Sequence, residues 1–222
     1  MNKKIILAIL GSPHKNGITA TMLNHAVHQA EEKGYIVETI NLYEKNIAFC
    51  IGCRTCIHTK NCIQKDDIQE IVRLINECEI VFLAAPVYWA NVPAPVKNLF
   101  DRLLGTAIGE ANPLPEARLN GKKYMLFTSC NTPAPFSWIF GQSRGISRNV
   151  DEFFRLAGMK RIGKFVCSNS ANRKELPHSL IRNIEKTLKA KIYTSNLAKP
   201  AKPVNGQQQG VLPPRTIIQK GG

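Results

Sequence analysis

Four of the chain's seven cysteines lie close together in the segment FCIGCRTCIHTKNCIQKDD, at residues 49–67. Their spacing is C-x2-C-x2-C-x5-C, at Cys50, Cys53, Cys56 and Cys62. Two intervening residues let consecutive sulfurs turn toward one centre, and a fourth thiol can complete a zinc tetrahedron or a cube of iron and sulfide. The pattern therefore predicts a metal centre. An iron-sulfur cluster, zinc and free thiols beside another redox group are the open alternatives.

A second stretch with chemical potential is GSPHKNGITATML, at residues 11–23. It follows an apolar run and leads into a helical pattern. Glycine and proline turn the backbone, the first amides of a helix attract an anion, and Ser12, Thr19 and Thr21 add hydroxyl donors. The stretch has neither the Gly-Lys-Ser/Thr ending of a Walker loop nor the G-x-G-x-x-G pattern of a dinucleotide site. We interpret it as a phosphate cradle, with an ordinary strand-to-helix turn as the alternative.

Two later stretches offer groups that suit a planar ring. PVYWANVPAPVKN, at residues 86–98, contains the flat side chains of Tyr88 and Trp89. SCNTPAP, at residues 129–135, adds Ser129, Asn131 and Thr132. Aromatic faces beside polar groups are typical of sites for flat ligands. The alternative is that the two aromatic residues belong to a core or an interface.

Hydrophobic periodicity indicates the elements that position these residues. Continuous apolar runs of strand length occur at residues 4–10, 79–86, 122–130 and 162–168, and an alternating run at 35–42. Segments with helical spacing lie at residues 19–33, 67–77, 93–104, 144–158 and 174–194. Strands that are apolar on both faces and separated by helices indicate a parallel sheet covered on both sides. The predicted class is α/β, with a five-stranded, doubly wound parallel sheet.

The doubly wound sheet also predicts where the site lies. In such sheets a ligand binds beyond the carboxyl ends of the strands, where the strand order reverses. The loops after the first, third and fourth strands should therefore converge. Local signals support the element boundaries: Asp66 and Gln69 form a capping-box pattern, and Gly34 and Gly158 are placed to end helices.

Length and composition indicate one domain with a tail. The 222 residues, 44% of them hydrophobic, can bury a full core. We assign residues 1–195 to the domain, with a cysteine-rich loop at 49–65, and residues 196–222 to a basic Pro/Gln-rich tail. The net charge is +14, and it favours anionic partners such as nucleotides, or else a solvated helix face plus a basic tail. No nucleic-acid recognition motif accompanies it, which argues against nucleic acid.

The apolar stretches do not predict a membrane span. The opening MNKKIILAIL has a short apolar run without a cleavage site, and we interpret it as a buried strand. The stretch IVFLAAPVYWANVPAPV is interrupted by prolines. We therefore expect a cytoplasmic protein. In a reducing compartment, clustered cysteines favour metal or redox chemistry over structural disulfides.

GSPHKNGITATML followed by PVYWANVPAPVKNLFDR resembles the flavodoxin-like NAD(P)H-dependent FMN reductase family, over roughly residues 3–168. The resemblance implies a flavodoxin-like three-layer fold, FMN as cofactor and NAD(P)H as electron donor. It assigns the FMN phosphate to Ser12, His14, Asn16, Gly17, Ile18 and Thr19, and the flavin ring to Pro86, Val87, Tyr88 and Trp89, with Asn131 and Thr132 nearby. His14 stands where an arginine is common in such loops, so phosphate binding would depend on backbone and hydroxyl donors.

The cysteine run carries a narrower resemblance. A compact C-x2-C-x2-C-x5-C run before an Asp-Asp helix start is similar to the iron-sulfur flavoproteins. That resemblance implies a 4Fe-4S cluster on Cys50, Cys53, Cys56 and Cys62 that exchanges electrons with FMN in a dimeric assembly.

These sequence features are compatible with three functions. The first is an FMN-dependent NAD(P)H oxidoreductase of the flavin or quinone reductase type, with no catalytic acid or base from the chain, because the flavin performs the chemistry. The second is an iron-sulfur electron carrier, and the third a non-enzymatic zinc or nucleic-acid binding module. The resemblance implies a homodimer or homotetramer. The apolar loop at residues 133–142 would then form an interface, cover its own core or cover the flavin.

Overall fold

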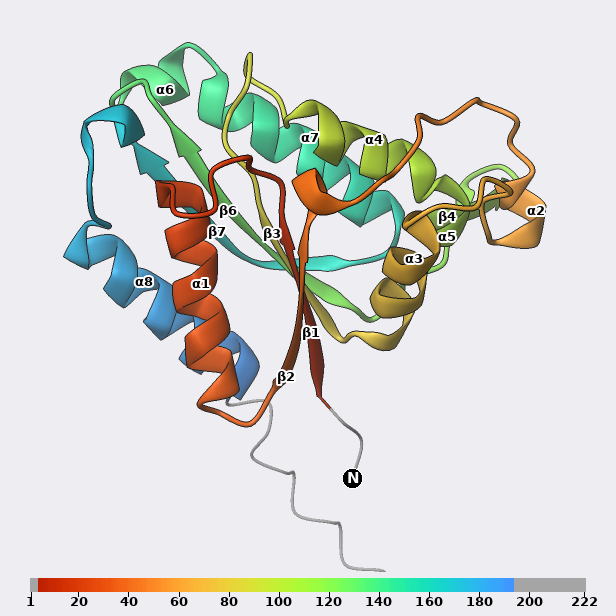
Figure 1. The fold of residues 1–222 in the computed structure, drawn as a ribbon, viewed down its shortest axis with the longest axis horizontal. Helices are drawn as coiled ribbons and strands as arrows, with labels where there is room; N and C mark the ends of the chain where they lie inside the picture. The colour runs from red at the N-terminus through yellow and green to blue at the C-terminus, as the bar shows by residue number, and fades with distance from the viewer. Residues whose placement is uncertain (1–3, 194–222) are drawn as a thin grey trace, which may run out of the picture.

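The structure is a computed structural model that describes residues 4–193. Its main sheet contains the parallel strands β1 (Ile5–Leu10), β2 (Ile36–Asn41), β3 (Ile80–Ala84), β6 (Lys123–Cys130) and β7 (Lys160–Ser168), in the order β2-β1-β3-β6-β7. Figure 1 shows this twisted sheet at the centre of the molecule. The order reverses between β1 and β3, which is the flavodoxin-like arrangement. The predicted fold class is confirmed.

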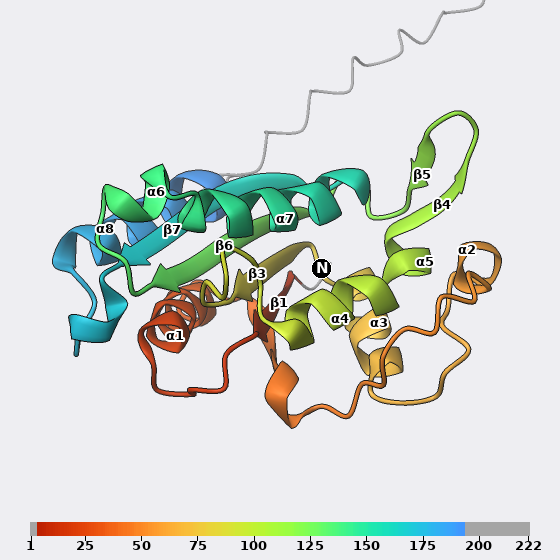
Figure 2. The ribbon, with the colours of Figure 1, turned by 90° about the horizontal axis from the view of Figure 1, so that it is seen from above.

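Five helices cover the two faces of the sheet: α1 (Ile18–Glu31), α3 (Ile68–Glu77), α4 (Ala94–Arg102), α7 (Gln142–Leu156) and α8 (His178–Leu188). Helices α1 and α8 lie together on one face, and α3, α4 and α7 lie on the other (Figures 1 and 2). The predicted three layers are therefore present. The predicted tail at residues 196–222 lies outside the described residues.

The core divides between the two faces because side chains alternate along each strand. In β1, Ile6 and Ala8 face the cluster under α1 and α8, whereas Leu7 and Ile9 face the cluster under α3, α4 and α7. All four are fully or almost fully buried. Burial of each larger apolar side chain contributes roughly 1.5–3 kcal/mol. The strand ends are thus fixed by both clusters.

The predicted boundary signals are present in the structure. The Ile68 N–H donates to Asp66 Oδ1 at 3.0 Å, and the Asp66 N–H donates to Gln69 Oε1 at 2.9 Å, which is a capping box at the start of α3. Gly34 and Gly158 follow the ends of α1 and α7 with φ values of +81° and +86°. Only glycine adopts this left-handed backbone without strain.

Several small elements were not predicted. They are the helices α2 (Cys56–Thr59), α5 (Leu104–Ala107) and α6 (Phe136–Ile139), the hairpin of β4 (Ile108–Ala111) and β5 (Pro115–Ala117), and the single turns η1 (Leu42–Glu44), η2 (Ser170–Asn172) and η3 (Lys189–Tyr193). The predicted helix at 174–194 starts only after Pro177, because proline disfavours helical backbone in the residue before it. Within residues 4–193, no helix is both long and apolar enough to cross a bilayer.

Candidate functional site

Loops from four strand ends meet in one crevice of about 310 Å³, here called the strand-end crevice. It is lined by Ser12, His14, Gly17, Ile18, Thr19, Pro86, Tyr88, Ser129, Asn131, Ser170 and Ala171. These residues follow β1, β3, β6 and β7, so the predicted convergence of loops occurs where the strand order requires it.

One end of the crevice is an uncapped helix start. Gly17 is the N-cap of α1, with extended backbone, and no side chain accepts a hydrogen bond from the first turn. No acidic residue lies in that turn either. The first amides of a helix lack partners within the helix and carry a partial positive charge. An anion such as a phosphate can therefore bind there through backbone donors.

Buried hydroxyls tie this loop to the neighbouring strand end. Ser12 and Thr19 are buried. The Thr19 and Ser129 hydroxyls are 2.6 Å apart, and the His14 N–H donates to Ser12 Oγ at 3.2 Å. The hydroxyl of Thr21 is engaged elsewhere, because it donates to the Gly17 carbonyl at 3.1 Å. Of the predicted hydroxyls, those of Ser12 and Thr19 belong to the crevice.

The loop after β3 forms the other wall. The Val87 N–H donates to the Ser129 carbonyl at 2.8 Å, which continues the alignment of β3 with β6. Tyr88 and Asn91 then exchange two hydrogen bonds of 2.9 Å around a turn in which Trp89 and Ala90 both have positive φ. This is the backbone of a type I′ turn. It leaves Tyr88 at the crevice and Trp89 fully exposed at the tip.

The structure brings together most, not all, of the predicted binding residues. Those that line the crevice are Ser12, His14, Gly17, Ile18, Thr19, Pro86, Tyr88 and Asn131. Four others lie outside the lining: Asn16, Val87, Trp89 and Thr132. Val87 packs against the core on the α3 side, and Asn16 is exposed.

Sequence reasoning missed two lining residues, Ser170 and Ala171, which lie on η2 after the fifth strand of the sheet. The hydroxyl of Ser170 donates to Asn131 Oδ1 at 3.0 Å and so orients that amide. The signal that could have found them is the rule that a ligand binds beyond the carboxyl ends of the strands. It applied to the last strand as well as to the loops after the first, third and fourth.

The cysteine loop, residues 49–65, lies apart from this crevice. Cys50 and Cys53 are exposed, and Cys56 and Cys62 are half-buried. Among the described residues, no three His, Cys, Asp or Glu side chains are arranged as ligands of one metal ion. Cys50 borders an apolar pocket of about 430 Å³ between the loop and helices α4, α5 and α7.

The four sulfurs are nonetheless close enough to interact electrostatically. Burial raises the pKa of the Cys56 thiol, the Gly105 backbone N–H lowers it, and the negative charges of Cys62, Cys53 and Cys50 raise it further. In contrast, hydrogen bonds from the backbone and side chain of Thr55 lower the pKa of the exposed Cys53. A cation bound between these sulfurs would favour their thiolate forms.

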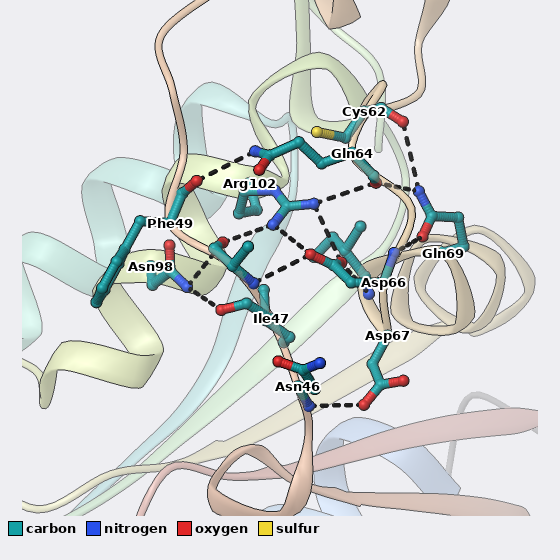
Figure 3. Close-up of polar contacts among 12 residues, drawn as sticks. Asn46, Ile47, Phe49, Cys62, Gln64, Asp66, Asp67, Gln69, Asn98 and Arg102 are labelled. Atoms are coloured by element: carbon teal, nitrogen blue, oxygen red, sulfur yellow. Dashed lines mark hydrogen bonds and ion pairs between the residues drawn. The ribbon is translucent and has the colours of Figure 1, made fainter.

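One side of the cysteine loop is anchored by a buried ion pair (Figure 3). Arg102, at the end of α4, donates to the two Asp66 carboxylate oxygens at 2.8 and 3.1 Å. The same guanidinium donates to the carbonyls of Ala48 at 2.5 Å and Gln64 at 3.3 Å. Burial lowers the pKa of Arg102, but the Asp66 carboxylate and the nearby Cys62 sulfur raise it by more. The Arg102 guanidinium therefore connects residues on both sides of the loop.

A second anchor lies on the other side of the loop. Arg118 donates to the carbonyls of Gly105 at 2.6 Å and Ile57 at 2.8 Å. Helix α5 approaches α2 so closely that a Cβ on Gly105 would lie 2.1 Å from the Cys56 carbonyl oxygen. Only glycine fits at this contact.

Helix α4 joins the two regions. Its N-terminal end follows the crevice loop that contains Pro86 and Tyr88, and Arg102 at its C-terminal end holds the cysteine loop. Figure 2 shows the cysteine loop around α2 at one end of the molecule, away from the N-terminal end of α1. Nine helical residues span about 13 Å at 1.5 Å each. Within one chain the two regions are therefore separate sites.

Comparison with known proteins identifies the family. Residues 5–133 match the model of the family described as NADPH-dependent FMN reductase, which is more than half of the chain. The chain belongs to this FMN reductase family. The predicted resemblance is thereby confirmed.

Several relatives found by sequence comparison carry the name iron-sulfur flavoprotein. One from Archaeoglobus fulgidus is 43% identical over 98 residues, which is 44% of this chain and 44% of the relative. Another from Methanocaldococcus jannaschii is 35% identical over 104 residues, which is 47% of this chain and 54% of the relative. The chain therefore spans about half the length of the curated relatives it matches.

Solved structures with low sequence identity show the same fold. The NAD(P)H:quinone oxidoreductase from Methanothermobacter marburgensis has a TM-score of 0.65 and 14% identity, and the match covers 85% of this FMN reductase family chain and 97% of that one. An FMN-dependent NADH-azoreductase from Bacillus anthracis, solved with FMN, has a TM-score of 0.61 and 12% identity, with coverage of 86% and 97%.

Proposed function

We propose that the chain is an FMN-dependent NAD(P)H oxidoreductase whose flavin binds in the strand-end crevice. The observation that carries the proposal is the uncapped start of α1 at Gly17, facing a crevice whose opposite wall offers Pro86, Tyr88 and Asn131. The start of α1 suits the anionic phosphate of a mononucleotide, and the opposite wall suits its planar ring. Membership of the family supports FMN as that mononucleotide.

The chemistry belongs to the cofactor, and the chain's residues position it. When bound, FMN supplies hydride transfer from NAD(P)H and passes electrons to an acceptor. The amides at the start of α1 would hold its phosphate, with Ser12 and Thr19 alongside. Pro86 and Tyr88 would limit the movement of the ring, and the amide of Asn131 would contact its polar edge. No side chain of the crevice is assigned to proton transfer.

The direct test is FMN titration of flavin-free protein, followed by anaerobic oxidation of NADH and NADPH with a quinone. We expect stoichiometric binding and acceptor-dependent oxidation. Thr19→Val removes a buried hydroxyl of the crevice and should weaken FMN binding. Thr21→Val removes the hydroxyl of a residue that does not line the crevice and should leave FMN binding unchanged. A protein that takes up no FMN, or a flavin bound elsewhere, would end the proposal.

A second redox centre in the cysteine loop is favoured by its donor set. Four thiols, a backbone N–H of Gly105 directed at the Cys56 sulfur and the guanidinium of Arg102 near Cys62 suit an anionic iron-sulfur cluster. Zinc on the same thiols and free thiols are the alternatives. The names of the relatives favour the cluster. Because the sulfurs are not arranged as ligands in this structure, the loop would close around the group that it binds.

Anaerobic purification with analysis of iron, zinc and acid-labile sulfide distinguishes these alternatives. Iron with equimolar sulfide supports the cluster. Zinc without sulfide supports a structural zinc site, and four freely alkylated thiols without metal support neither. With a cluster present, electrons would pass between a two-electron flavin and a one-electron centre.

The cysteines and one exposed apolar loop support a proposal about compartment and assembly. All seven cysteines are free thiols, which supports a reducing cytoplasmic setting. The loop at residues 133–142 exposes Phe136, Trp138, Ile139 and Phe140, so it does not fold over its own core. An exposed apolar cluster of this kind suits an interface between copies of the chain. We propose a homodimer or homotetramer, to be tested by sedimentation velocity.

A further inference from the structure

Arg102 is unusual because its charged side chain has no exposed surface. Its hydrogen bonds go to residues within the cysteine loop or directly beside it. A guanidinium has five N–H donors. Four of them match the acceptors in this structure: two on Asp66, the Ala48 carbonyl and the Gln64 carbonyl. The fifth, on Nε, is buried and has no hydrogen-bond partner among the described residues.

These acceptors lie on the two arms of the cysteine loop. Ala48 comes just before Cys50, and Gln64 and Asp66 come just after Cys62. Asn98, one turn earlier on α4, adds bonds of 3.0 and 3.3 Å to the carbonyls of Ile47 and Ala48. The Ala48 N–H in turn donates to the Asp66 carboxylate at 3.0 Å. Figure 3 shows the guanidinium between the arms, with the Cys62 side chain beside it.

An ion pair needed only for stability would not require this arrangement. Buried ion pairs contribute little net stability, because desolvation offsets their attraction. A buried donor without a partner carries a further desolvation cost. That cost is removed if an anionic sulfur group near Cys62 accepts the fifth N–H.

We propose that Arg102 is the positioning residue of the cysteine loop: it fixes both arms to α4 and supplies its remaining N–H donor to the sulfur centre that Cys62 joins. The inference rests in part on the proposed cluster. Its first half concerns the free loop and can be tested without metal. Its second half concerns the charge and hydrogen bonding around the sulfurs.

The test compares Arg102→Lys with Arg161→Lys. Lysine keeps the positive charge but loses the planar fork. Arg161 pairs with Asp151 on the β7 and α7 side of the fold, so its variant controls for loss of an ion pair outside the loop. Because R102K leaves Asp66 poorly paired, a second variant, Arg102→Met with Asp66→Asn, removes both charges together and keeps the comparison interpretable if R102K fails to fold.

Four measurements are made on each variant. In metal-free protein, hydrogen exchange of the Ala48 amide should be faster in R102K than in R161K. The Ala48 N–H donates to Asp66, and R102K no longer holds that carboxylate in place. In iron-loaded protein, the affinity of R102K for iron, measured by competition with a chelator, should be lower by about 10-fold or more. Loss of an outer-shell partner usually has an effect of this size. The cluster's midpoint potential should become more negative, because a hydrogen bond to sulfur stabilises the reduced state. FMN affinity should be unchanged.

The outcomes separate the two proposals. Ala48 exchange, iron retention and potential in R102K equal to those of R161K would overturn the role of Arg102 while leaving the cluster in place. A wild-type chain that takes up no iron would end the cluster proposal. The inference then depends on the exchange rate alone: faster Ala48 exchange in R102K supports the anchoring role, and an unchanged rate overturns it.

Discussion

Gly17 offers a test in which one substitution changes folding and binding in opposite directions. As the N-cap of α1 it has extended backbone that aspartate can adopt, and no side chain caps the helix now. The new Cβ would lie 3.2 Å from that of His14, an exposed residue that can move by a few tenths of an ångström. Gly17→Asp should therefore stabilise the flavin-free protein, by a few tenths of a kcal/mol from capping and roughly 0.3–1 kcal/mol from the helix dipole.

The same carboxylate should weaken FMN binding. A unit negative charge about 6 Å from a phosphate charge, at an effective dielectric constant of about 20, costs roughly 3 kcal/mol. That corresponds to a loss in affinity of about 100-fold or more. Gly17→Asn separates the causes, because it caps the helix without charge. Gly17→Asn should lower FMN affinity by no more than about 10-fold. The difference in FMN affinity between the two variants should become smaller as salt is added.

Flavin titration at low and high salt, with thermal unfolding of the flavin-free forms, measures all of these quantities. If G17D binds FMN as tightly as wild type, or loses no more affinity than G17N, the phosphate does not lie at the start of α1. A loss of stability in the flavin-free G17D protein would instead show that Gly17 is needed for its backbone or for space.

Three further predictions concern other parts of the molecule. Gly105→Ala must displace the Cys56 backbone, because its Cβ would lie 2.1 Å from a carbonyl oxygen; overpacking of this kind costs about 1–3 kcal/mol, seen as a lower melting temperature and reduced iron uptake. Burial raises the pKa of Asp66, but Arg102 and two backbone N–H groups together hold it below its ordinary value of 3.8. The stabilisation is therefore present above that pH and lost as the pH falls through the lower folded value, so denaturant unfolding should show a steeper acid loss for wild type than for D66N. Trp138→Ser with Phe140→Ser should lower the assembled mass in sedimentation, because both side chains are exposed in the single chain.

The first of these has a matched control variant, and each has an outcome that would contradict it. Gly34→Ala strains a positive-φ backbone with no atom within 4 Å of the new Cβ, so it should reduce stability without changing iron uptake. Equal iron uptake and melting temperature in G105A and wild type would contradict the close approach. Parallel acid profiles for D66N and wild type would contradict the assigned linkage. An unchanged mass for the double serine variant would place the interface on another surface.

The sequence predicted the sheet and the place of the crevice because both follow from periodicity. Apolar runs such as residues 79–86, separated by helical segments, indicate strands buried on both faces, and the strand order then places the loops. The four residues outside the crevice lining show where this reasoning stops. Val87 and Trp89 follow Pro86 and Tyr88 in alternation, but a turn with two positive φ values decides which side each occupies. Such turns are usually marked by glycine or asparagine, and neither stands at its two central positions here.

The cysteine loop shows the complementary limit. The spacing of the thiols predicts a metal centre, which stays a prediction, and the residues that hold the loop come from far along the chain. Arg102 lies 36 positions after Asp66, and Arg118 lies 61 positions after Ile57. Nothing in the local pattern distinguishes these arginines from the other basic residues. Their roles follow only from the packing of α4 and α5 against the loop.

The single short helix between the crevice and the cysteine loop fixes their relative orientation as well as their distance. Each residue of an α-helix turns the chain by about 100°. Inserting or deleting one residue within Ala94–Arg102 would rotate the guanidinium away from Asp66 although no contacting residue had changed. A four-residue insertion would nearly restore its direction but displace it by about 6 Å along the axis. The length of α4 is thus a structural constraint in its own right, and relatives with the same pair of sites should tolerate substitutions on this helix better than any change in its length.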